Sequence, residues 1–211
     1  MNKNLKIGFL LSPGMLTTGT AYPYEMWAAG SEHAKARRLD LDSRLYLISA
    51  SQKEQSGRLP LQSDFNIGNC PSLDVLYLPA LWRNPRVVLN SIRESLLPWI
   101  RTVNAGGTQI AAVGSGVCFL AATGLLDNKP ATTHWYYFDE FKKNYPKVDL
   151  KSEFFITQSG SLHCAASINS LADVTVYLIE IFLGLETALH VERNFSHEIR
   201  RDYKKQRFSV G

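Results

Sequence analysis

The chain alternates between short, continuous apolar runs and longer stretches in which apolar residues recur every three or four positions. Continuous runs of this length are typical of buried strands, whereas the wider spacing is typical of helices with one apolar face. Strands are predicted at 5–11, 43–49, 73–78 and 110–113, and helices over 86–104, 117–125, 169–183 and 186–203. Because strands alternate with helices, the expected fold is an α/β sandwich with a largely parallel sheet.

Prolines and threonines refine several of these boundaries. Pro23 is expected to open a helix at its first position, where a missing N–H costs nothing, after a loop over 15–22. Pro98 lies inside a predicted helix, so a kink or two separate helices are expected. Thr133 is the expected N-cap of a helix that ends near Tyr145. Residues 61–67 are predicted to form a short edge strand, and 153–157 with 162–164 a late strand pair.

The stretch 110–126 is the chemical centre of the chain. An apolar strand is followed by the tight turn Gly114-Ser115-Gly116 and, at once, by a helix. This is the pattern of a nucleophile elbow, where the apex side chain stands clear of the sheet beside the free N–H groups of a helix N-terminus. The apex residue here is Gly114, which has no side chain. The backbone N–H groups of Gly116 and Val117 are expected to face a ligand cleft beside this elbow.

Length and composition narrow the class of protein. The 211 residues are expected to form one large domain, or one domain and a tail. The three cysteines are expected to be reduced, and no Cys/His spacing suits zinc, so neither a metal nor a cofactor is expected. No apolar run approaches the ~18–20 residues of a membrane span, and no signal segment precedes the first strand, so we expect a cytoplasmic location without membrane contact.

The distribution of charge adds one ambiguous signal near the end of the chain. The net charge of +4 is too mild to indicate nucleic-acid binding by itself. Residues 193–207, however, hold six basic side chains and two acidic ones. Two readings fit this segment: a solvated helix face, or a contact with DNA phosphates.

Several strings of residues resemble the ThiJ/PfpI superfamily, whose members are related to class I glutamine amidotransferases. The most specific strings are Gly124-Leu125-Leu126-Asp127 and Ala131-Thr132-Thr133-His134-Trp135. Weaker ones are Gly116, Ala121, Pro23-Tyr24-Glu25-Met26, Gly160, Cys164-Ala165-Ala166 and Ala172-Asp173. Within the superfamily the chain looks like the GlxA-like regulators, which join this domain to an AraC-type DNA-binding domain. The resemblance extends to about residue 190 and implies a flavodoxin-like three-layer sandwich with a nucleophile elbow.

The chain departs from the family where the chemistry occurs. Carried over by position, the family's catalytic cysteine falls on Gly114, and its histidine partner on His134, which is kept. The acidic residue that hydrogen-bonds the thiol falls on Gly19, and the glycine before the first motif's proline is Tyr22, which is expected to intrude on the cleft. Thiol catalysis needs a thiolate and a group that tunes its pKa, so the resemblance implies a domain without the family's catalysis.

The function that the resemblance implies, together with the lost catalytic groups, is ligand sensing and dimerisation in an AraC-family transcriptional regulator. Residues 1–190 would form the ThiJ/PfpI-like domain and 191–211 a basic helix or tail that links it to a DNA-binding domain outside this chain. A small metabolite would bind in the degenerate elbow cleft, and the protein would be a homodimer. The expected ligand-binding residues are Gly19, Tyr22, Gly114, Ser115, Gly116, Val117, His134 and Trp135.

Two alternatives remain open at this point. One is a hydrolase, amidase or hydratase of the same superfamily, in which Ser115 or Cys118 replaces the lost nucleophile and His134 is the base. Cys118 is expected instead to be a small core residue. The other alternative is an oligomer-forming domain without a ligand. Trp82 is expected to be a packed core or interface aromatic rather than a ligand contact.

Overall fold

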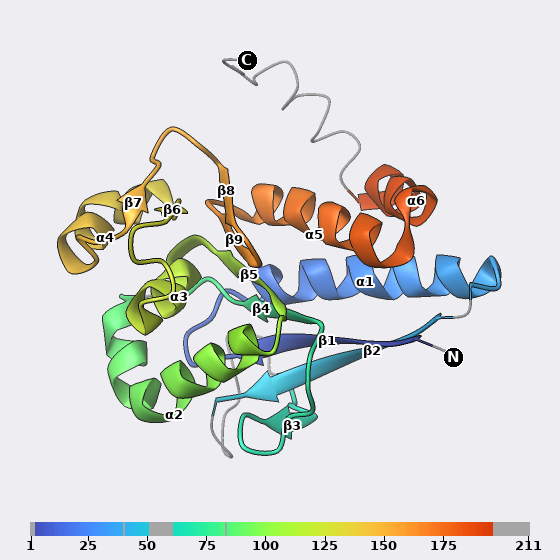
Figure 1. The fold of residues 1–211 in the computed structure, drawn as a ribbon, viewed down its shortest axis with the longest axis horizontal. Helices are drawn as coiled ribbons and strands as arrows, with labels where there is room; N and C mark the ends of the chain where they lie inside the picture. The colour runs from blue at the N-terminus through green and yellow to red at the C-terminus, as the bar shows by residue number, and fades with distance from the viewer. Residues whose placement is uncertain (1–2, 40, 51–60, 83, 196–211) are drawn as a thin grey trace.

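A seven-stranded sheet in the order β3-β2-β1-β4-β5-β9-β8 runs through the middle of the molecule (Figure 1). The computed structural model describes residues 3–39, 41–50, 61–82 and 84–195. All neighbouring strands pair in parallel except β8, which is antiparallel to β9. The strands are β1 (Lys3–Leu11), β2 (Leu41–Ser49), β3 (Phe65–Asn66), β4 (Val75–Leu78), β5 (Gln109–Val113), β8 (Ile156–Ser159) and β9 (Leu162–Ala165). Apart from the two-residue β3, the parallel strands follow the flavodoxin-like order 2-1-3-4-5.

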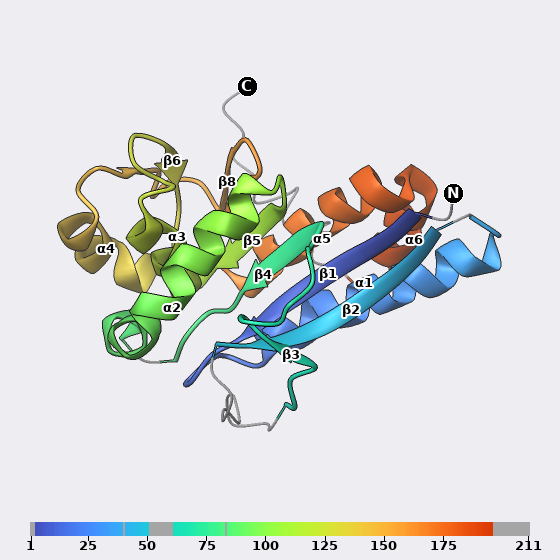
Figure 2. The same ribbon diagram turned by 60° about the horizontal axis from the view of Figure 1, so that its bottom comes forward.

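Helices cover both faces of this sheet (Figures 1 and 2). One face packs against α1 (Thr18–Ala36), α5 (Ile168–Leu183) and α6 (Leu185–Phe195), and the other against α2 (Pro85–Ala105), α3 (Val117–Thr123) and α4 (Phe138–Asn144). A short two-stranded sheet, β6 (Pro130–Ala131) with β7 (Asp149–Leu150), lies beside α4. The expected three-layer α/β sandwich with a mostly parallel sheet is confirmed.

The central strands are continuous apolar runs because both of their faces are covered. In β4, Val75 and Tyr77 belong to the core beneath α1 and α5, whereas Leu76 and Leu78 belong to the core beneath α2 and α3. Alternate residues of a strand point to opposite faces, so a strand between two helical layers needs an apolar residue at every position. The same rule explains the apolar run of β5.

The helix α1 begins earlier than the sequence indicated. Pro23 is its sixth residue rather than its first, so the prediction that Pro23 opens the helix was wrong. The stretch before it is helical because Gly19 and Thr20 are buried against the rest of the fold, and such packing outweighs the weak helix propensity of these residues. As a result, Gly19 lies in the first turn of a helix and not in a loop.

Two other predictions at proline and at the chain end can be compared with the structure. Residues 85–105 form one helix that contains Pro98 and bends along its length (Figure 2), which is one of the two expected outcomes. The helix α6 crosses the predicted boundary at residue 190, and Val191 is fully buried. Most of the basic segment 193–207 lies outside the described residues, so the division into 1–190 and 191–211 stays a prediction.

In the described part of the chain, no helix combines the length and the apolar character that crossing a membrane requires.

Replacing Tyr77 by phenylalanine should destabilise the layer between the sheet and α1. The Tyr77 hydroxyl accepts the indole N–H of Trp27 at 2.9 Å and donates to Thr175 Oγ1 at 3.2 Å, in a fully buried position. Without that oxygen the indole N–H has no acceptor, so the free energy of unfolding should fall by about 1–3 kcal/mol, as measured by urea denaturation. The matched control is Tyr24→Phe, at a half-buried ring packed on Phe9, which should cost less than about 0.5 kcal/mol. Equal losses in the two variants would contradict this account of the hydroxyl.

Candidate functional site

The predicted elbow is present between β5 and α3. A single turn of 3-10 helix, Gly114–Gly116, joins the two, and Gly114 has φ +52°, in the left-handed region that most side chains avoid. Gly116 lies so close to the chain leaving β4 that a Cβ atom there would come within 2.8 Å of the Pro79 carbonyl carbon and still closer to its oxygen. The elbow therefore needs a glycine at 116 for steric reasons.

A Cβ atom would fit at the apex, although the residue there is a glycine. A Cβ atom on Gly114 would lie 3.4 Å from Ala80 Cβ and 3.8 Å from His134 Cβ, which are ordinary packing distances. The Gly114 carbonyl accepts the hydroxyl hydrogen of Thr133 at 2.8 Å, and this bond holds the loop before His134 against the elbow. The structure thus brings Gly114 and His134 together.

The hydroxyl of Ser115 is hydrogen-bonded to the backbone of Leu81. Its Oγ accepts the N–H of Leu81 at 2.9 Å and donates to the carbonyl oxygen of Leu81 at 3.1 Å. Both hydrogen-bonding roles of the hydroxyl are therefore used to clamp the loop after β4 onto the elbow. A serine nucleophile needs a base to take its proton, and here that proton is directed at a carbonyl oxygen.

The N–H groups at the elbow are less available than expected. Val117 is fully buried, and its N–H is donated back to the carbonyls of Gly114 and Ser115 within the turn. The prediction that this N–H faces the cleft was wrong, because a 3-10 turn uses the N–H three residues after each carbonyl.

His134 has a structural role as well as a position beside the apex. Its side chain caps the short 3-10 helix Trp135–Tyr137, with Nδ1 accepting the N–H of Tyr136 at 3.4 Å. The predicted cap, Thr133, instead donates its hydroxyl to Gly114, so that prediction was wrong. Trp135 follows with 70% of its surface exposed and its ring 5.7 Å from that of Tyr136.

Gly19, which the resemblance aligned with an acidic residue, lies next to the elbow. A Cβ atom on Gly19 would lie 3.3 Å from Ile168 Cδ1, 3.4 Å from Val113 Cγ1 and 3.6 Å from the Ala80 nitrogen. Gly19 and Gly114 therefore both approach Ala80. The space beside Gly19 is partly filled by the apolar side chain of Ile168, so nothing there can tune the pKa of a thiol.

Tyr22 does not join this group in the way the sequence suggested. Its hydroxyl donates to the carbonyl of Phe195 at 2.6 Å, and the two rings lie 6.1 Å apart. Burial, and then the nearby Asp173 carboxylate, raise the pKa of Tyr22 and keep it protonated. Tyr22 therefore directs its hydroxyl to the end of α6 and not to the apex.

The cysteines are poor nucleophiles in this fold. Cys118 and Cys164 are fully buried, and burial raises the pKa of both thiols. Cys70 is half-buried, with its pKa raised to about 11 by burial. Only a thiolate attacks readily, so none of these three groups is prepared for covalent catalysis at neutral pH.

Some residues of the site gave no signal in the sequence. Ala80 and Leu81 follow β4, and Ile168 opens α5; each reaches the elbow through pairing and packing between distant segments. The only available hint was that β4 and β5 end at the same edge of a parallel sheet. Trp82 was expected to be a packed core or interface aromatic; 60% of its surface is exposed, so it is not a core residue, and the interface alternative stays a prediction.

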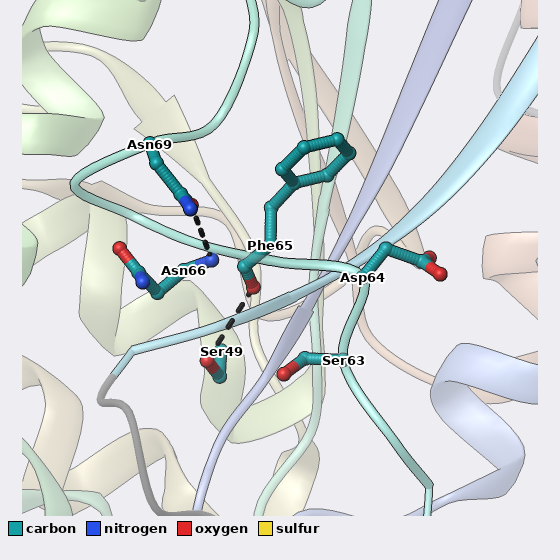
Figure 3. A pocket seen from close by; sticks show the side chains of 6 residues that line it. All are labelled: Ser49, Ser63, Asp64, Phe65, Asn66 and Asn69. Atoms are coloured by element: carbon teal, nitrogen blue, oxygen red, sulfur yellow. Dashed lines mark hydrogen bonds between the residues drawn. The ribbon is translucent and has the colours of Figure 1, made fainter.

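A separate polar pocket of about 350 Å³ lies at the carboxyl end of β2 (Figure 3). Its lining consists of Ser49, Ser63, Asp64, Phe65, Asn66 and Asn69. The amide oxygens of Asn66 and Asn69 accept backbone N–H groups of the local turn, at 2.8 Å each. These bonds shape the turn after β3, and the pocket contains none of the residues predicted from the sequence.

Comparison with known sequences gives transcriptional regulators and one enzyme. No protein-family model matches the chain. The chain is 27% identical over 190 residues to the HTH-type transcriptional regulator CdhR of Pseudomonas aeruginosa, covering 89% of this chain and 53% of CdhR, so it spans about half of that regulator's length. It is 30% identical over 98 residues to the HTH-type regulator GlxA of Rhizobium meliloti, covering 46% and 30% of the two chains. It is also 28% identical over 188 residues to the isonitrile hydratase of Pseudomonas putida, covering 89% and 76%.

Comparison with solved structures confirms the fold. A transcriptional regulator protein from Vibrio parahaemolyticus has a TM-score of 0.83 at 21% identity, covering 92% of this chain and 100% of that one. An AraC family transcriptional regulator from Pseudomonas putida has a TM-score of 0.73 at 18% identity, covering 91% and 100%. A ThiJ/PfpI family protein from Pseudomonas syringae has a TM-score of 0.73 at 20% identity, covering 90% and 73%.

Alanine at the two elbow glycines should have unequal effects on stability. Gly114→Ala adds a methyl group at an ordinary packing distance and pays only for a left-handed backbone, about 1–2 kcal/mol. Gly116→Ala places a methyl group against the Pro79 carbonyl, so it should lower the free energy of unfolding by more than about 4 kcal/mol or prevent folding. Urea denaturation of both variants measures the difference, and a smaller loss at 116 than at 114 would contradict the geometry described here.

Proposed function

Starting from a chain with the ThiJ/PfpI fold and a sequence similar to GlxA- and CdhR-type regulators, we propose that this protein is the non-catalytic, ligand-sensing and dimerising domain of an AraC-family transcriptional regulator. A small metabolite binds at the degenerate elbow. DNA is contacted only through a domain outside this chain, in the cytoplasm where such a regulator meets DNA.

The observation that carries this proposal is the elbow that keeps its backbone but has no reacting group. Gly114 lies at the apex with a left-handed φ, beside His134. Neither nearby residue that could replace the lost nucleophile is available. The Ser115 hydroxyl is hydrogen-bonded to the Leu81 backbone, and the Cys118 thiol is buried in the core. A preserved shape without the reacting atom favours binding over bond breaking.

The proposed contacts of the ligand combine small and polar groups. Gly19 and Gly114 both lie beside Ala80 and carry no side chain, and Ile168 and Val113 make the surroundings of Gly19 apolar. His134 and Gly116 supply polar atoms, and Trp135 is exposed beside them. Apolar walls with a few polar groups are typical of small-molecule sites. Tyr22, Ser115 and Val117 then support the site by hydrogen bonds of their own rather than by touching the ligand.

The ligand would act by binding two arrangements of the protein with different affinity, because only such a difference shifts an equilibrium. The proposed connection to the DNA-binding partner is the segment that begins in α6, so that 1–190 senses and 191–211 links. The names of the relatives CdhR and GlxA, both HTH-type transcriptional regulators, support this assignment.

The enzyme alternative is kept because one relative is an isonitrile hydratase. It would require turnover without a nucleophile at the apex, with His134 as the base. The hydrogen bond from the Ser115 hydroxyl to the Leu81 carbonyl and the raised pKa of the Cys118 thiol both argue against an enzyme.

A compound that binds the elbow should stabilise the protein in a thermal-shift screen of small metabolites. A free ligand concentration of about 100 times the dissociation constant raises the free energy of unfolding by about 2.7 kcal/mol. The shift should be lost in His134→Ala and kept in the control Cys70→Ser, at a half-buried thiol. If the same shift persists in His134→Ala, the ligand binds elsewhere.

Restoring the family's thiol alone should not create an enzyme. Gly114→Cys places sulfur at the apex, but position 19 still offers no acidic partner and Ile168 occupies part of the space. We expect no turnover of an amide, an isonitrile or a 2-oxoaldehyde, as followed by product formation. Turnover that appears in Gly114→Cys, and also survives Cys118→Ala, would contradict the proposed loss of catalysis.

A further inference from the structure

Six large apolar side chains are exposed around the elbow, and we call them the elbow surface. Each of them has between 55% and 79% of its surface exposed. They are Trp82, Val87, Trp135, Tyr136, Phe154 and Phe155. We propose that the elbow surface is the interface between two copies of this chain, so that each elbow is closed by the partner. This inference rests on the dimer in the proposed function, and it names the face that the dimer uses.

The elbow surface comes from three segments of the chain, and hydrogen bonds join these segments to the elbow and to one another. The segment that contains Trp82 is clamped to the elbow through Leu81 and Ser115. The start of α2 is joined to the Trp135–Tyr137 turn by the hydroxyl of Tyr137, 3.5 Å from Asn84 Oδ1. The third segment is joined by Thr132, whose hydroxyl donates to the Phe154 carbonyl at 2.8 Å.

These segments gather at one end of the molecule. Figure 1 shows the start of α2, α4, β6 and β7 at the end opposite to the N-terminus of β1. The hydrogen bonds between the segments fix their backbones before any partner arrives. An interface of this kind loses little conformational freedom on binding, because aromatic side chains have few rotatable bonds.

The composition and size of the elbow surface fit a protein interface. Trp, Tyr and Phe are enriched in interface cores and dominate binding energy, whereas single exposed apolar residues are ordinary on monomers. With aromatic side chains of about 150–250 Å² each, the exposed apolar area here is roughly 600–800 Å². A stable interface buries about 800 Å² on each partner. The elbow surface alone therefore comes close to what a stable dimer needs.

A second copy is the occupant that the charges around the surface favour. The ion pairs Arg86–Glu140, at 3.9 Å, and Lys151–Asp149, at 3.0 Å, place both signs of charge beside the apolar side chains. A two-fold axis brings the same patch onto itself, and a rim with both signs can pair with its own copy. A partner of a single strong charge would find no such match here.

A second exposed apolar stripe provides an internal comparison. Tyr177 and Ile181 on α5, with Leu185 and Leu189 on α6, are between 39% and 57% exposed. This stripe lies on the helix layer that ends in α6, on the other face of the sheet from α2 and α4. It is less exposed and contains a single aromatic residue. Substitution there is a matched control for substitution on the elbow surface.

The experiment is sedimentation equilibrium of the protein over a range of concentrations, with the matched variants Tyr136→Ala and Ile181→Ala. Tyr136 is 79% exposed and is not a proposed ligand contact, so its variant should fold normally, as circular dichroism checks. Loss of the Tyr136 ring should weaken the dimer by about 30-fold or more, whereas Ile181→Ala should change the dissociation constant by less than about 2-fold.

Other outcomes would overturn the inference. A dimer that is weakened by Ile181→Ala and not by Tyr136→Ala would place the interface on α5 and α6, and the proposed sensing function would still stand. A protein that stays monomeric at every concentration would overturn both this inference and the dimer of the proposed function. A metabolite that still stabilised such a monomer, with the shift lost in His134→Ala, would leave sensing at the elbow intact.

Discussion

The close approach between the β5–α3 turn and the chain that leaves β4 is the constraint on which the site depends. Gly116 lies against the Pro79 carbonyl, and the Ser115 hydroxyl bonds both the N–H and the carbonyl of Leu81. These contacts hold the end of one strand to the end of its neighbour. Between them, Gly114 has a left-handed φ of +52°, and a Cβ atom built on it would lie 3.4 Å from Ala80 Cβ and 3.8 Å from His134 Cβ.

That constraint separates the shape of the elbow from its chemistry. The turn depends on a glycine at 116 and on a hydroxyl at 115, and its left-handed backbone at 114 favours a glycine there as well. A chain can therefore lose the apex side chain without losing the fold, and here the apex is Gly114. The acidic partner expected at position 19 is absent as well, and Ile168 packs where it would lie. The losses concern the same reaction, which is why we interpret the site as one that recognises a ligand.

The fold was largely predictable from the sequence, because both faces of the central strands are buried and read as continuous apolar runs. The order of glycines at 114 and 116 likewise predicted the elbow. What the sequence could not provide were contacts between distant segments. The Tyr22 hydroxyl donates a hydrogen bond to the Phe195 carbonyl, and the Thr133 hydroxyl donates one to the carbonyl of Gly114, 19 positions earlier. Local sequence patterns predicted that Thr133 caps a helix and that Pro23 begins one. Both predictions were wrong because contacts between distant segments determine the structure at these positions.

The central claim is that the elbow binds a metabolite without changing it. Saturation-transfer NMR on a metabolite that stabilises the protein tests this directly, since one sample reports both contact with the protein and any product. The account predicts transfer of saturation to the metabolite, no transfer with His134→Ala, and an unchanged metabolite spectrum after prolonged incubation. The growth of product signals with the unmodified protein would contradict it.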